Sequence, residues 1–108
     1  MDRKEAVKAF KTRKVPAGIF VIRCRTTGDV WADSTPNLDA ARNRTWFQLQ
    51  GGLHRNKSLQ EAWNTHGEQA LDFEVVETLD EDLSPMALPD VLRDKKAEWA
   101  TKIRAQPL

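Results

Sequence analysis

The sequence predicts an α+β fold in which a small three-stranded antiparallel sheet is flanked by helices, with an extra helix at the N-terminus. Three observations predict it. The 108 residues are enough for a single domain, 1–108. Two runs rich in β-branched and aromatic residues, 18–25 and 30–34, flank a four-residue turn, which is typical of a β-hairpin. Helix signals and one further strand follow, so the expected order is α-ββ-α-α-β-α.

The N-terminal segment 1–14 is expected to hold a helix over residues 2–13. Ala6, Val7 and Phe10 form a narrow apolar stripe at helical spacing. Pro16 then interrupts the pattern.

The hairpin is expected to present two different faces. Phe20, Ile22 and Cys24 alternate along the first strand and share one face, so Cys24 is expected to be a small buried residue. Gly28 lies in the turn, where a positive φ is needed. The second strand covers 30–34.

Two helices are expected after the hairpin. Thr35 is the expected N-cap of the first, with Pro36 at its first position, and this helix runs to about Gln50. Residues 58–61 form a capping box for a shorter helix that ends at Gly67. The expected buried face of the first helix comprises Leu38, Ala41, Thr45, Trp46 and Leu49.

The C-terminal part is expected to add a third strand and a last helix. Residues 71–79 alternate as a strand, and an acidic link, 80–82, follows. The last helix is expected over about 90–104, inside the segment 84–104. Its expected buried residues are Leu88, Leu92, Trp99 and Ile103.

Charge is distributed unevenly along the chain although the net charge is +1. Residues 1–25 contain eight Lys or Arg and two acids, whereas residues 72–82 contain six acids and no base. This asymmetry indicates either a local positive field that attracts anions or ordinary solvated faces. An acidic strand beside a basic segment would also suit self-association or a charged partner.

Several classes of protein are disfavoured by the sequence. No apolar run approaches the ~20 residues of a membrane span, and the first residues do not resemble a signal peptide, so we expect a cytoplasmic protein without membrane contact. One cysteine cannot form an internal disulfide, and with two histidines it offers no zinc-binding pattern.

An ordered series of residues over 17–80 resembles the GIY-YIG nuclease superfamily, in its homing-endonuclease-like branch. Residues 18–20 stand at the first signature tripeptide, and residues 31–33, followed by Ser34, stand at the second. The rest of the series comprises Asn37, Leu38, Gly52, His54, Asn56, Leu59, Gln60, Ala62, Trp63, Asn64, Gly67, Phe73, Glu74, Val75 and Glu77.

The resemblance implies hydrolysis of a phosphodiester with one divalent metal ion, Mg²⁺ or Mn²⁺ in an active enzyme. It implies tyrosine hydroxyls at the catalytic positions that Phe20 and Trp31 occupy, yet the chain contains no tyrosine. A phenyl ring has no hydroxyl, and an indole N–H donates but does not accept a proton. Both residues are also expected as ordinary packing aromatics. Asp33 replaces the glycine of the second tripeptide and adds negative charge.

The other two catalytic positions of the family also differ. The position of its arginine falls on Ala41, with Arg42 as the neighbour that a shift in register would bring there. The position of its metal-binding carboxylate falls on Lys96, and Glu98 is the nearby candidate ligand, with Asp90 and Asp94 close in sequence.

Three functions follow from these observations. The first is a catalytically degenerate nuclease-like domain that still binds DNA or another nucleic acid. The second is an active metal-dependent endonuclease that uses Arg42 and a carboxylate of the last helix. The third is a protein-interaction module without nucleic-acid activity. The candidate nucleic-acid-binding residues are Arg23, Arg25, Arg42, Arg44, His54, Arg55 and Lys57, of which His54 could equally brace its loop. We expect cleavage to be lost.

Overall fold

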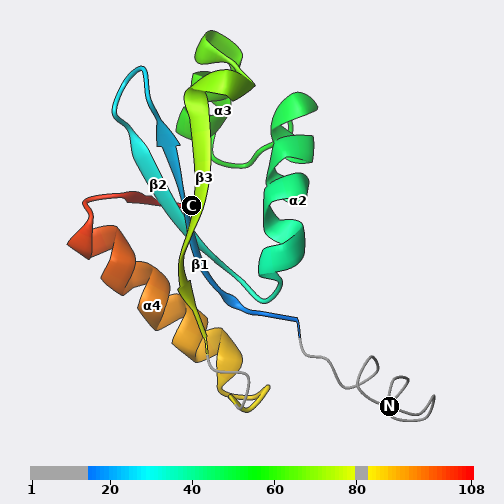
Figure 1. The fold of residues 1–108 in the computed structure, drawn as a ribbon, viewed down its shortest axis with the longest axis vertical. Helices are drawn as coiled ribbons and strands as arrows, with labels where there is room; N and C mark the ends of the chain where they lie inside the picture. Colours follow the sequence, from blue (N-terminus) through cyan, green and yellow to red (C-terminus); the bar gives the residue numbers. More distant parts are fainter. Residues whose placement is uncertain (1–14, 80–82) are drawn as a thin grey trace, which may run out of the picture.

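A four-stranded mixed sheet forms the centre of the computed structural model, which describes residues 15–79 and 83–108 (Figure 1). The order of the strands is β3-β1-β2-β4. β1 pairs antiparallel with β2 and β3, and β4 pairs parallel with β2. The strands are β1 (Gly18–Cys24), β2 (Val30–Thr35), β3 (Leu71–Thr78) and β4 (Gln106–Pro107). The expected helix over 2–13 lies outside the described residues.

Strand β1 is buried on both faces because helices cover both sides of the sheet. Phe20, Ile22 and Cys24 belong to the larger core cluster, whereas Val21 packs with Ala32 on the opposite face. All five side chains are almost inaccessible to water. The alternation expected for the first strand is therefore confirmed, and so is the burial of Cys24.

The helices lie on opposite faces of the sheet (Figure 1). Helices α2 (Leu38–Gln50) and α3 (Lys57–His66) cover one face, and α4 (Leu88–Lys102) covers the other. A short 3₁₀ helix (Glu68–Ala70) leads into β3. The buried residues of α2 are those that helical spacing predicted: Leu38, Ala41, Thr45, Trp46 and Leu49.

The sheet has one strand more than the three that the sequence predicts. Helix α4 ends at Lys102 rather than near 104, and Arg104 adopts a positive φ of 54° that turns the chain back. The returning segment lies along β2, where the Leu108 N–H donates to the Ala32 carbonyl at 2.9 Å. A two-residue strand containing Pro107 has no sequence signal, because this pairing depends on a distant partner.

Both predicted helix N-caps are wrong by two residues. Asn37, rather than Thr35, caps α2 by accepting from the Ala40 N–H. Asn56, rather than Ser58, caps α3 by accepting from the Leu59 N–H.

The hydroxyl of Thr35 does not serve as a cap because Thr35 is the last residue of β2. Its hydroxyl instead bonds the backbone of Asn37, which leaves Asn37 as the capping residue.

None of the helices in residues 15–79 and 83–108 has the length and apolar character needed to cross a membrane.

Replacement of Gly18 by alanine is expected to destabilise the fold by about 2 kcal/mol. A Cβ atom at Gly18 would overlap the backbone carbonyl of Glu77 on β3 and lie 2.9 Å from Leu38 Cδ1. Urea unfolding measures the loss. Gly51→Ala is the matched control, because its Cβ would have ordinary contacts and the φ of −82° suits alanine. Equal stability of the two variants would contradict the prediction.

Candidate functional site

A polar pocket of about 280 Å³ opens on the face of the sheet that carries α2 and α3. Phe20 and Asp33 enter it together because they are direct partners in the β1–β2 register and so share one face. The described residues that line the pocket are Phe20, Asp33, Arg44, Thr45, Gln48, Leu53, His54 and Arg55.

Helix α2 supplies the wall of the pocket through one side of its last two turns. Arg44 and Gln48 are four residues apart and therefore lie one above the other. Thr45 is buried beside them and fixes that side of the helix against the core. Arg44 is thereby placed at the boundary between the buried and exposed sides of α2.

The loop between α2 and α3 holds His54 in a defined orientation. The His54 N–H donates to Gln60 Oε1 at 3.1 Å, and Gln60 Nε2 donates in turn to the Leu49 carbonyl at 2.9 Å. The Asn56 N–H donates to His54 Nδ1 at 3.0 Å. Because Nδ1 accepts this bond, the proton of the neutral ring lies on Nε2.

The ring of His54 is favoured in its neutral form. Partial burial lowers the pKa of His54 below its ordinary value, and the charge of Arg55 lowers it further. A neutral imidazole with Nε2 protonated is a hydrogen-bond donor and does not accept a proton there. His54 therefore adds a donor to a pocket that already contains two guanidinium groups.

Asp33 is paired with a lysine from the opposite side of the sheet. Lys96 Nζ of α4 lies 3.4 Å from Asp33 Oδ1, and both side chains are less than a quarter exposed. Asp33 also accepts from the Ser34 N–H at 2.8 Å. Lys96 donates in addition to the carbonyl of Leu108. The pair therefore neutralises the carboxylate at the position where the resemblance implies a glycine.

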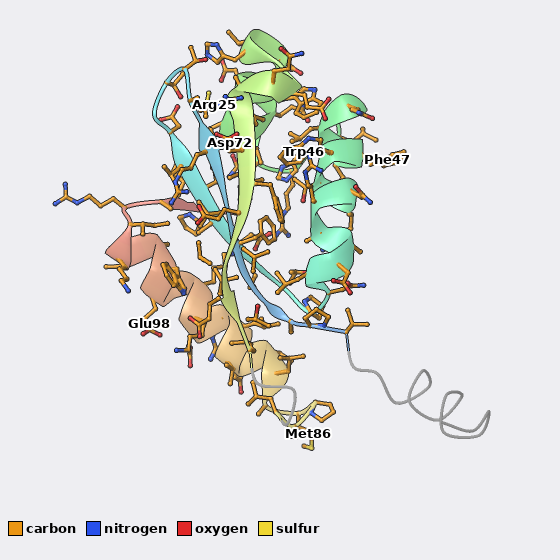
Figure 2. All side chains as sticks on the ribbon, in the orientation of Figure 1. Arg25, Trp46, Phe47, Asp72, Met86 and Glu98 are labelled. Atoms are coloured by element: carbon orange, nitrogen blue, oxygen red, sulfur yellow. The ribbon has the colours of Figure 1, made fainter. Side chains whose placement is uncertain are left out.

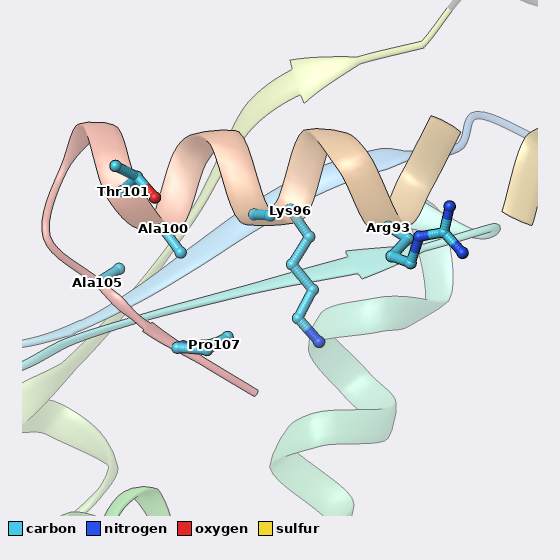
Figure 3. Close-up of a pocket in the computed structure, with 7 residues that line it drawn as sticks. Arg93, Lys96, Ala100, Thr101, Ala105 and Pro107 are labelled. Atoms are coloured by element: carbon cyan, nitrogen blue, oxygen red, sulfur yellow. The ribbon is translucent and has the colours of Figure 1, made fainter. Parts of the chain in front are cut away.

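Lys96 also lines a second hollow, a groove of about 430 Å³ between α4 and the C-terminal segment (Figure 3). Figure 3 shows Lys96 extending away from α4, while Ala100, Ala105 and Pro107 form the apolar side of the groove. The Asp33–Lys96 pair thus connects the polar pocket on one face with this groove beside α4.

The two positions implied to carry tyrosine are buried. Phe20 is 2% exposed and stacks on Phe73 with ring centroids 4.8 Å apart. Trp31 is 1% exposed, and its Nε1–H donates to Ser58 Oγ at 2.8 Å. Phe20 lines the pocket with its ring, whereas the N–H of Trp31 is directed to α3. Neither side chain offers a group that could accept a proton in the pocket.

Arg42 and Glu98 do not reach the pocket. Arg42 is two residues from Arg44, which is about 200° around the helix, and its guanidinium lies 5.5 Å from the centre of the Trp46 ring. Glu98 lies on the outer side of α4, 69% exposed, and pairs with Lys95 at 3.8 Å (Figure 2). The structure therefore separates the two residues that the enzyme alternative requires.

Arg23 of β1 and Arg25, which follows that strand, do not line the pocket and pair with acids of β3. Arg23 pairs with Glu74, and Arg25 Nε lies 3.1 Å from Asp72 Oδ2 (Figure 2). Part of the expected charge asymmetry is thus cancelled within the chain by cross-strand pairs. Lys57, the first residue of α3, is exposed and does not line the pocket.

The pocket does not fit the divalent metal ion that the resemblance implies. Asp33 is its one carboxylate among the described residues, and the ammonium of Lys96 already neutralises it. In 15–79 and 83–108, no group of three or more His, Cys, Asp or Glu side chains could hold a metal ion. Hard divalent cations require several oxygen ligands.

The structure thus brings together Phe20, Arg44, His54 and Arg55 from the residues chosen by sequence. Sequence reasoning missed Thr45, Gln48 and Leu53 as lining residues. The spacing of Arg44 and Gln48 was a usable signal, because residues four apart share a helix face. Leu53 had no signal, since its position depends on how the loop after α2 folds back.

These features define an α+β domain with the GIY-YIG nuclease fold, here with a four-stranded sheet. The solved catalytic domain of the homing endonuclease I-TevI is similar, with a TM-score of 0.71 and 19% identity over 85% of this chain and 97% of that one. A mutant of the catalytic domain of intron endonuclease I-TevI gives a TM-score of 0.70 at 19% identity, over 83% of this chain and 86% of that one. This identity establishes the fold alone.

No protein-family model matches the chain, and no curated protein matches it.

Stability is expected to fall as the pH drops from about 6.5, the ordinary pKa of histidine. The folded protein keeps His54 neutral, so the unfolded chain binds more protons and the free energy of unfolding decreases until the lower folded pKa is passed. One group contributes a slope of at most about 1.4 kcal/mol per pH unit. Urea unfolding at several pH values is expected to show a flatter profile for His54→Gln. Superimposable profiles for the unsubstituted protein and His54→Gln would refute the prediction that folding keeps His54 neutral.

Proposed function

We propose that this nuclease-like domain binds the phosphate backbone of nucleic acid in the pocket of Arg44, His54 and Arg55, and does not cleave it. The observation that carries the proposal is the composition of the pocket. Arg44, His54 and Arg55 supply donors to it, and Lys96 neutralises its one described carboxylate. The positive charge of the pocket therefore favours the binding of an anion.

Phosphate oxygens are acceptors, so the pocket offers them complementary groups. Guanidinium groups form strong charge-assisted hydrogen bonds with phosphate, and a neutral His54 adds an Nε2–H donor. Contacts of this kind fix the position of a nucleic acid without reading its sequence. The proposal therefore predicts binding that depends on salt.

The absence of cleavage is proposed from the chemistry of the residues at the implied catalytic positions. Phe20 cannot exchange a proton with an attacking water, and it is stacked on Phe73. Lys96, at the position where the resemblance implies a metal-binding carboxylate, pairs with Asp33. Arg42 lies against Trp46 rather than in the pocket. An active nuclease would need a proton-accepting group at the position of Phe20, a carboxylate at that of Lys96, and an arginine that reaches the pocket.

Supercoiled plasmid and branched DNA are expected to remain intact when they are incubated with the protein and Mg²⁺ or Mn²⁺. The physical reason is that the described pocket lacks a set of metal ligands, that Phe20 and Trp31 carry no proton-accepting group, and that its one described carboxylate, Asp33, is already paired with Lys96. Gel electrophoresis measures nicked and linear products. Nicking above background that disappears in Arg42→Ala would overturn the proposal and favour the active endonuclease.

Arg44→Ala is expected to weaken binding of labelled DNA or RNA about tenfold at low salt, because one charge-assisted phosphate contact is lost. The magnitude of the slope of log K against log salt concentration should also decrease by about 1. Fluorescence anisotropy at several salt concentrations measures both quantities.

Arg25→Ala is the matched control for this titration. Arg25 is exposed, pairs with Asp72 and does not line the pocket, so its removal should leave affinity unchanged. Equal losses in the two variants would argue for diffuse attraction instead of this pocket. Absence of binding at low salt would remove the proposed function altogether.

A further inference from the structure

Helix α2 exposes a phenylalanine beside the polar pocket. Phe47 is 75% exposed, and Figure 2 shows it projecting away from the sheet. It is two residues from both Thr45 and Leu49, which places it about 200° from the buried side of the helix. Packing within the described chain therefore does not account for this side chain.

A second exposed apolar side chain lies at the same end of α2. Leu53 is 77% exposed and lines the polar pocket itself. Its N–H donates to the Gln48 carbonyl at 2.8 Å, which fixes the loop against the last turn of α2. We call Phe47 and Leu53 the apolar rim. Single exposed apolar residues are common, so the position of the rim matters more than its exposure.

The rim adjoins positive charge. Phe47 follows Arg44 by three residues, and side chains at this spacing are neighbours on the helix surface. Arg44, Arg55 and the exposed Leu53 all line the pocket. An exposed aromatic ring next to arginines is the combination on which unpaired bases stack while their phosphates are held by charge.

We propose that the apolar rim binds an unstacked base of single-stranded nucleic acid, with Phe47 as the stacking surface. The inference rests on the proposed function, because the phosphate of the same strand would occupy the pocket of Arg44 and Arg55. In a duplex the bases are stacked on one another, so no base face is available to stack on Phe47. The rim would therefore make the domain prefer single strands to duplexes of equal length.

The test is titration of a single-stranded oligonucleotide that contains 2-aminopurine, whose fluorescence falls when the base stacks on an aromatic ring. Phe47→Ala should lower affinity about tenfold and abolish the quenching, because one stacked base is lost. Phe47→Tyr should keep both, and Phe47→Leu should lose the quenching although it remains apolar. Duplex binding should not change in any of the three variants.

Met86→Ala is the matched control, because Met86 is 90% exposed at the other end of the molecule (Figure 2). Loss of affinity in Arg44→Ala with no effect of Phe47→Ala would refute the stacking role and leave the proposed function in place. An equal loss for duplex would refute the preference for single strands.

Two further outcomes would also overturn the inference. The Phe47→Ala variant could have a smaller molar mass than the unsubstituted protein in light scattering and bind the oligonucleotide equally well. This result would show that the rim contacts another protein chain instead of a base. No binding of any oligonucleotide by the unsubstituted protein would refute the proposed function as well.

Discussion

The double burial of β1 is the constraint on which the rest of the structure depends. A strand covered on both faces must be apolar at nearly every position, and its side chains must alternate between two packed layers. Residues 18–22 and 24 are buried, and only Arg23 within the strand is exposed. Because β1 pairs with both β2 and β3, its register decides which side chains of those strands meet α2 and which meet α4.

The same register places a carboxylate in a position where it needs a partner. Asp33 lies opposite Phe20 and so shares a face with the aromatic core. A partly buried charge without a counter-charge is unfavourable, and Lys96 provides that counter-charge from α4. The C-terminal segment contributes as well, since Lys96 donates to the carbonyl of Leu108. Asp33 and Lys96 thus compensate each other electrostatically.

Arginines of this chain illustrate how geometry, and not residue type, decides what a side chain can do. Arg25 is held by Asp72 across the strands, and Arg42 lies over the ring of Trp46. Arg44 and Arg55 face a hollow instead. A count of basic residues treats all four as equal candidates for phosphate contact. Their orientation on strand, helix and loop separates two that are engaged within the fold from two that line a pocket.

Local patterns determined the β1–β2 hairpin, the buried side of α2 and the order of the helices and the first three strands, because alternation and helical spacing are properties of short segments. The resemblance placed Phe20 among the candidates, and basic residue type placed Arg44, His54 and Arg55 there. Tertiary structure alone decided the pairing of β4, the contact between Asp33 and Lys96, and the separation of Arg42 from the pocket. These depend on contacts between residues far apart in the chain or on the side of a helix that faces the core, and neither is encoded locally.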